Sequence, residues 1–61
     1  MDWKIWIGKK VFIQTENSKL FGKVVEVTDS GDGLIWIGFY NFNGKFILLR
    51  TTEIKKIEEI D

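Results

Sequence analysis

The sequence predicts an all-β fold: a small, strongly bent barrel of five strands. Segments rich in Val, Ile, Phe and Trp have the length of strands, and turn signals separate them at the spacing of a small barrel. A glycine at position 22, near the start of the second segment, lets that strand bend sharply because it has no Cβ. With 61 residues the chain forms one domain, 1–61, and buries only about 60% of its unfolded surface.

The turn signals divide the chain into its predicted strands. They are Gly8 with Lys9, then residues 16–18, then 29–33, then Asn43 with Gly44. The strands expected between them cover residues 10–15, 20–28, 34–42 and 45–50, with a last strand near Ile57. In the first strand Val11 and Ile13 are expected to point inward and Phe12 outward, and in the second strand Val25 and Val27 are expected to point inward.

Both ends of the chain allow two interpretations. Residues 1–7 have apolar side chains at strand spacing and also at helical spacing, so periodicity does not decide between them. After residue 50 the sequence is compatible with a short helix or with a 3₁₀ turn at 51–53 followed by a closing strand at 55–60. We favour the closing strand, because a sheet without it keeps an unpaired edge.

The dipeptide Asn43-Gly44 predicts a hairpin with a two-residue type I′ loop between Phe42 and Lys45. In that register both faces of the hairpin are apolar, so the rest of the chain, another copy or a ligand must cover the excess. The predicted pairs are Tyr40 with Ile47 and Gly38 with Leu49 on one face, and Phe39 with Leu48 and Ile37 with Arg50 on the other.

Composition excludes several classes of protein. Nine basic and nine acidic residues balance, so the whole chain has no net attraction for phosphate. There is no Cys or His, which excludes disulfides and Cys/His zinc sites. The chain has no long apolar run, and lysines interrupt its N-terminal apolar residues, so we expect a cytoplasmic protein without membrane contact. Abundant Ile, Lys and Glu without Pro or Ala hint at an AT-rich or thermophilic source.

The sequence shows no catalytic constellation. The turn at 29–33 holds Asp29 and Asp32, but it lacks the further oxygen ligands of a calcium loop and the Lys-Ser/Thr ending of a phosphate loop. We therefore expect a protein that is not an enzyme and uses no metal or cofactor. Trp36, Tyr40 and Phe42 fall on one face of the hairpin, where they serve either as core or as a platform that stacks nucleic-acid bases.

The chain resembles the Sm-like proteins, a family of small five-stranded barrels within the wider SH3-like class that form rings and bind RNA. Residues 8–13 resemble their first strand, and residues 21–24 resemble the bent glycine segment of their second. Arg50, Ile54 and Ile57 match the spacing of the Arg and apolar positions in their second motif. The stacking residue and Asn of the family's RNA loop are absent here, and Thr51 replaces a Gly, so only Asp29 and Arg50 carry over.

The resemblance implies a non-enzymatic binding module for RNA or other single-stranded nucleic acid. It also implies a homo-oligomeric ring, in which the fourth strand (Ile47, Leu48, Leu49) pairs with the fifth (Ile57) of the next copy. The alternative is a monomeric SH3-like barrel that docks a protein or peptide. The candidate residues for binding nucleic acid or a partner are Arg50, Asp29, Trp36, Tyr40, Phe42 and Lys45.

Overall fold

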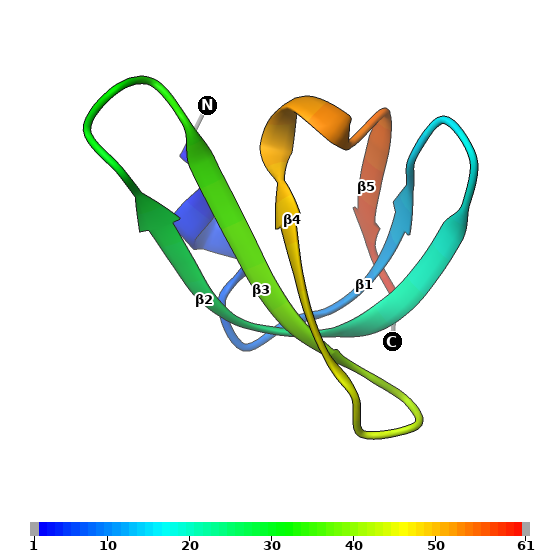
Figure 1. Ribbon diagram of the computed structural model, residues 1–61. Helices are drawn as coiled ribbons and strands as arrows, with labels where there is room; N and C mark the ends of the chain where they lie inside the picture. The colour runs from blue at the N-terminus through cyan, green and yellow to red at the C-terminus, as the bar shows by residue number, and fades with distance from the viewer. Residues whose placement is uncertain (1, 61) are drawn as a thin grey trace.

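The computed structural model describes residues 2–60, which form one curved sheet with two short 3₁₀ helices (Figure 1). Each of the first four strands lies within one residue of its predicted ends, so the all-β prediction is confirmed. In chain order the elements are η1 (Trp3–Trp6), β1 (Lys10–Gln14), β2 (Lys19–Asp29), β3 (Ile35–Asn41), β4 (Phe46–Arg50), η2 (Thr51–Glu53) and β5 (Lys56–Glu59).

The sheet is antiparallel throughout residues 2–60, with the strand order β4-β3-β2-β1-β5. Its curvature brings β4 and β5 toward the same side of the molecule (Figure 1). Over these residues, however, β4 and β5 are not hydrogen-bonded to each other. The sheet is therefore open, and the closed barrel predicted from the sequence is not formed.

Strand β2 is strongly curved (Figure 1), and β3 approaches it closely at Gly22, where the sequence predicts the bend. A Cβ at this position would meet the carbonyl oxygen of Tyr40 and would lie 2.7 Å from the Phe39 ring. Farther along β2 the pairing with β3 shifts between Val24 and Glu26, which makes Val25 the extra residue of a β-bulge. The bulge changes the faces: Val24 is buried and Val25 is exposed, so the predicted inward direction of Val25 is wrong.

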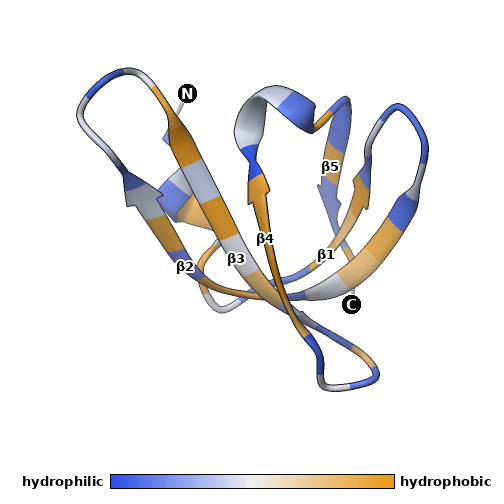
Figure 2. Cartoon of the chain, viewed as in Figure 1, coloured by the Kyte–Doolittle hydropathy of each residue, from blue (hydrophilic) through white to orange (hydrophobic). Residues whose placement is uncertain are grey.

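The core lies on the concave face of the sheet. Five side chains from β1, β2 and β3 are fully buried: Val11, Ile13, Val24, Ile37 and Phe39. Along β3 in Figure 2, strongly hydrophobic residues alternate with residues of near-neutral hydropathy, and Ile37 and Phe39 among the former are core side chains. Partly buried residues from both 3₁₀ segments and the remaining strands complete it: Trp3, Trp6, Leu20, Val27, Ile47, Leu49, Ile54 and Ile57.

The β3–β4 hairpin differs from its predicted register by one residue. Gly44 N–H donates to Asn41 O at 2.9 Å, and Asn41 N–H donates to Lys45 O at 2.9 Å. Gly44 has a φ of 83°, whereas no non-glycine residue described has a positive φ, which excludes the type I′ turn. The loop is a type I turn followed by a left-handed glycine, so three residues rather than two connect the strands.

The shift in register separates the two faces of this hairpin. Ile37 pairs with Leu49 and Phe39 with Ile47 on the core side. The outward pairs are Trp36 with Arg50, Gly38 with Leu48, and Tyr40 with Phe46. The predicted pairs of this hairpin are therefore wrong, although both of its faces carry apolar side chains as predicted. One face is core, and only the outer face needs an explanation.

Both ends of the chain are now assigned. The N-terminal segment is the 3₁₀ helix η1, with Lys4 N–H donating to the Asp2 side chain at 3.0 Å; Met1 lies outside the described residues. The C-terminal part follows the favoured interpretation, since η2 is a 3₁₀ turn and β5 pairs with β1.

Candidate functional site

The outer face of the sheet, opposite the core, carries a group of solvent-accessible aromatic rings. We call this group the aromatic face; its members are Phe12, Phe21, Tyr40, Phe42 and Phe46. Pairing across the strands places them on the same side, because Phe12 is opposite Phe21 and Tyr40 is opposite Phe46. Phe42 follows β3 and is the most exposed of them at 65%, and Tyr40 is 47% exposed.

The rings of the aromatic face form two groups. Tyr40 and Phe46 meet edge to face, with ring centroids 5.3 Å apart. Phe21 lies between Phe12, at 5.0 Å, and Phe42, at 6.5 Å with the two rings inclined by 25°. Each group therefore consists of rings in mutual contact that still present apolar surface to solvent.

Two lysines, Lys10 and Lys23, lie beside both aromatic groups, in the same row across the sheet as Tyr40 and Phe46, and we call them the lysine pair. Lys23 is opposite Tyr40 on one side and opposite Lys10 on the other. Phe21 stands two residues before Lys23 on the same side of β2, and Phe12 stands two residues after Lys10 on the same side of β1. The lysine pair thus adjoins the aromatic face, next to Tyr40 on one side and next to Phe21 and Phe12 along the strands.

The lysine pair has no ionic partner within 4.0 Å among residues 2–60. The ion pairs found over that range lie elsewhere: Lys9 with Glu59 at 3.7 Å, Arg50 with Glu53 at 3.9 Å, and Lys56 with Glu58 at 3.9 Å. Although the chain as a whole is neutral, its aromatic face contains cations that carboxylates do not neutralise. The face therefore combines stacking surfaces with local positive charge.

Arg50 is held by its own chain. Its guanidinium lies 5.7 Å from the centre of the Trp36 ring, and its Nε is 3.9 Å from Glu53 Oε2. The same carboxylate accepts the Arg50 backbone N–H at 3.3 Å. Arg50 shares the outer face with Trp36 and not the face of Ile37 and Phe39, so its predicted placement is wrong, as the hairpin register requires.

Asp29 is the last residue of β2, far along the strand from the aromatic face, and the turn that joins β2 to β3 follows it. Its Oδ1 accepts the Gly31 N–H at 2.9 Å. In the same turn Asp32 accepts from the Ser30 hydroxyl and from Leu34 N–H, and these hydrogen bonds hold the pKa of the Asp32 carboxyl below its usual value. The carboxylates of this turn thus organise its backbone, and the structure does not bring Asp29 to Tyr40 or Phe42.

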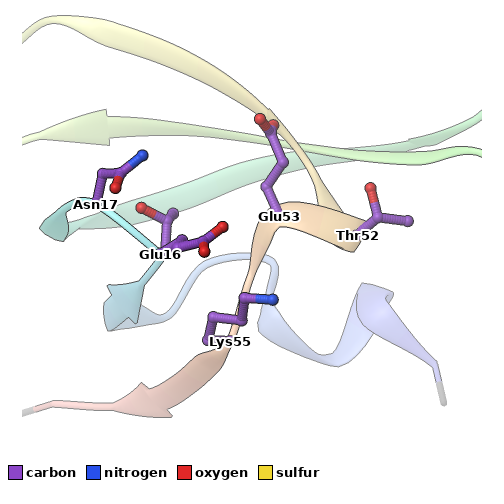
Figure 3. A pocket seen from close by; sticks show the side chains of 6 residues that line it. Glu16, Asn17, Thr52, Glu53 and Lys55 are labelled. Atoms are coloured by element: carbon purple, nitrogen blue, oxygen red, sulfur yellow. The ribbon is translucent and has the colours of Figure 1, made fainter.

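A polar hollow of about 240 Å³ lies at another place, between the β1–β2 turn and the η2–β5 segment. Figure 3 shows Glu16 and Asn17 on one side of it and Thr52, Glu53 and Lys55 on the other. It mixes opposite charges, and residues 2–60 contain no cluster of three or more acidic residues that could hold a metal ion. The hollow offers no arrangement of groups for a specific reaction.

The predicted oligomer edge divides between core and surface. Ile47, Leu49 and Ile57 pack against the core, whereas Leu48 points outward and is 49% exposed. The backbone edges of β4 and β5 are both open over residues 2–60. The two edges differ chemically, since β4 is hydrophobic over most of its length and β5 is mostly hydrophilic (Figure 2).

The structure brings together part of the predicted binding set. Trp36 and Tyr40 share the outer face with Phe42 beyond the end of β3, while Lys45 lies in the adjoining turn with its N–H donating to Asn41 Oδ1 at 2.9 Å. Five residues of the site were not among the candidates: Phe12, Phe21, Phe46, Lys10 and Lys23. The signal that reveals Phe46 is the turn sequence Asn41-Phe-Asn-Gly44, because Asn at the first position and Gly at the fourth favour a type I turn.

Comparison with known proteins adds no name to this site. No protein-family model matches the chain, and no curated protein or solved structure matches it either.

Among residues 2–60 no helix has the length and apolar character needed to cross a membrane.

Proposed function

We propose that this chain is a non-enzymatic binding module that holds single-stranded nucleic acid on its aromatic face. The observation that carries the proposal is the combination of accessible rings with the lysine pair, which has no carboxylate within 4.0 Å among residues 2–60. Stacking on a protein ring contributes about 1–3 kcal/mol per base and tolerates any sequence. The lysines supply the charge that a phosphate backbone requires.

Single-stranded nucleic acid suits this face better than a duplex. The rings stand on a curved sheet. Tyr40 and Phe46 meet edge to face, and Phe12 and Phe21 are tilted against each other, so unstacked bases can lie against the exposed ring surfaces. A duplex keeps its bases stacked and presents mainly phosphates, for which a neutral chain with a small local cluster of lysines has little attraction.

We further propose that the fold is a relative of the SH3-like and Sm-like barrels. A five-stranded antiparallel sheet that bends at Gly22 in its second strand, with a 3₁₀ turn before the last strand, supports this relationship. Ring assembly would pair β4 of one copy with β5 of the next. The charges support such pairing, because Lys45 precedes β4 and Arg50 is its last residue, while β5 contains Glu58 and Glu59 beside a single Lys56.

Fluorescence anisotropy with labelled oligothymidylate and oligouridylate tests the binding proposal. We expect binding at about 50 mM salt that weakens steeply toward about 200 mM. Tyr40→Ala and Phe42→Ala should each weaken binding about 5- to 100-fold, in line with one lost stacking contact. Ile5→Ala is the matched control, because Ile5 is an equally exposed apolar residue on η1, away from the aromatic face. Absence of binding to both oligonucleotides at low salt would overturn the proposal.

One observation favours a second candidate, a protein partner that adds a strand to β4. Phe46 and Leu48 are exposed on this strand, and its outer backbone edge has no neighbour within residues 2–60. This candidate requires a partner peptide whose binding is insensitive to Tyr40→Ala but is lost when a proline replaces Leu48. Salt-dependent binding to oligonucleotides would decide for the first candidate.

A further inference from the structure

Lys10 and Lys23 form a cross-strand pair of like charges. They are direct partners in the β1–β2 ladder, and both are exposed on the outer face of the sheet. Like charges placed opposite each other destabilise a sheet. Their neighbours in the same row across the sheet are Tyr40 on β3 and Ile60 beyond β5, and neither supplies a negative charge.

The carboxylates near this pair in the strand ladders do not form ion pairs with it within 4.0 Å among residues 2–60. Glu26 is the next outward residue of β2 beyond the bulge and stands opposite Gly38. Glu58 stands opposite Phe12 and is engaged with Lys56 at 3.9 Å. Glu59 stands opposite Val11, on the other side of the sheet, and is engaged with Lys9 at 3.7 Å. Over residues 2–60 the two ammonium groups therefore place two positive charges side by side without an ion pair that would stabilise the fold.

The surroundings of the lysine pair match the repeat of a nucleic-acid strand. Tyr40 and Phe46 lie on one side of Lys23 in the same row, and the next outward row holds Phe12 on β1, Phe21 on β2 and Phe42 after β3. Same-face positions on a strand are about 6.6 Å apart. Two bases that stack on the two aromatic groups would thus leave the phosphate that joins them beside the lysine pair.

We infer that Lys10 and Lys23 together bind one internucleotide phosphate, so that the smallest unit recognised by this face is a dinucleotide step. The inference rests on the proposed function and assigns its charged contact. Ammonium groups suit this task, because each is a compact charge with three rotatable donors that adapts to a phosphate oxygen. The ligand class is a phosphodiester with a base on each side, in RNA or in single-stranded DNA.

The salt dependence of oligothymidylate binding tests whether the two lysines share one phosphate. For single strands the slope of log K against log salt changes by about 0.7 for each neutralised phosphate. The double variant Lys10→Gln/Lys23→Gln should lower the slope by about 0.7, whereas two independent phosphate contacts would lower it by about 1.4. Lys4→Gln removes one positive charge from η1, away from the aromatic face, and should leave the slope unchanged. The inference would be overturned if the double variant kept the wild-type slope, as Lys4→Gln should, or if the magnitude of its slope fell by about 1.4.

A second measurement uses a dinucleotide with a single linkage. NMR titration with thymidylyl-thymidine should shift resonances of Lys10 and Lys23, and an analogue with a neutral methylphosphonate linkage should bind the wild type about 5- to 10-fold more weakly. The double lysine variant should bind both compounds equally. Thermal unfolding completes the test: Lys23→Gln should keep or raise the Tm, because it removes like-charge repulsion. A loss of binding that simply follows a loss of folding would contradict the assignment.

These outcomes distinguish failure of the phosphate assignment from failure of the proposed nucleic-acid binding. If oligothymidylate binds and Tyr40→Ala weakens it while the lysine variants have no effect, the aromatic face binds nucleic acid and the phosphate lies elsewhere. If the wild type binds no oligonucleotide, both the function and the phosphate site are rejected. If a protein partner is bound instead, the methylphosphonate comparison shows no difference because neither dinucleotide binds.

Discussion

At the scale of single residues, Gly22 and Gly38 lack a side chain for different reasons. At Gly22 a Cβ would run into the Tyr40 carbonyl oxygen, which belongs to the sheet backbone and cannot move alone. At Gly38 it would lie 2.8 Å from Glu26 Cγ and 2.8 Å from Phe46 Cζ, both of which are side-chain atoms. The first glycine is required by the bend, whereas the second only leaves room for flexible neighbours.

This difference predicts unequal effects of the same substitution. Gly22→Ala should lower the free energy of unfolding by about 3 kcal/mol, at the upper end of what overpacking usually costs, because backbone must shift. Gly38→Ala should cost about 1 kcal/mol or less, since rotation of Glu26 and Phe46 relieves the contact. Urea denaturation of both variants measures the difference. Equal losses would show that β2 does not need its bend at Gly22.

A second prediction concerns Asp32 and its hydrogen bond from Ser30. The folded pKa of Asp32 lies below its unfolded value, so the carboxylate stabilises the β2–β3 turn above the unfolded pKa, and this contribution is lost as pH falls through the folded pKa. Ser30→Ala removes the largest cause and should raise the pKa of Asp32 toward its usual value. NMR titration of the side-chain carboxyl carbon measures it. Ser18→Ala, in the β1–β2 turn, is the control and should leave the pKa of Asp32 unchanged.

At the scale of elements, the β3–β4 register decides which residues of β4 contact the core. In the structure Ile47 packs against the core and Leu48 faces solvent. Leu48→Lys should therefore change the free energy of unfolding by only about 0.5 kcal/mol. Ile47→Lys should largely unfold the protein, because it forces a charge into the core. Circular dichroism melting curves distinguish the two variants, and equal destabilisation would contradict the three-residue loop.

The same Leu48→Lys variant tests the edge of β4. A charge on an exposed edge strand opposes strand addition. If copies of the chain associate through β4, as ring assembly requires, Leu48→Lys should lower the average mass measured by light scattering. Lys4→Gln, on η1, changes the net charge away from both β4 and β5 and serves as the control.

Sequence patterns predict the elements better than their registers. Strand ends and the 3₁₀ turn before β5 follow from turn residues and β-branched runs, and the outward direction of Phe12 follows from simple alternation. The bulge at Val25 breaks that alternation, and nothing in the local sequence distinguishes it from a regular strand. Asn43-Gly44 allows both a two-residue and a three-residue loop. Because that choice moves every side chain of β4 by one position, the partners of Tyr40 and Arg50 could not be obtained from the dipeptide.

At the scale of the whole molecule, stability depends on very few buried side chains. Only Val11, Ile13, Val24, Ile37 and Phe39 are fully buried among residues 2–60. A single core in a chain below about 70 residues rarely supplies more than about 3–5 kcal/mol. Exposed rings on the outer face add little to this core, which is consistent with their use in binding rather than folding.

Truncation of the largest core residue should therefore exceed the stability of the fold. Phe39→Ala is expected to cost about 3–5 kcal/mol, comparable to the total, so that most molecules are unfolded at room temperature. Phe39→Leu keeps an apolar side chain and should remain folded with a lower melting temperature. The chemical-shift dispersion in one-dimensional proton NMR spectra at room temperature shows whether each variant is folded. A well-folded Phe39→Ala protein would show that the core is more extensive than the buried residues indicate.

The pairing of β5 with β1 has a consequence for how the chain reaches this structure. Three of the four strand contacts join neighbours along the chain, and each can form as a hairpin. Pairing Ile13 with Ile57 instead brings together opposite ends of the sequence, so it closes the longest loop and carries the largest entropy cost. Formation of the β2–β3 and β3–β4 hairpins should precede docking of β5, which places the slow step of folding at the C-terminal strand.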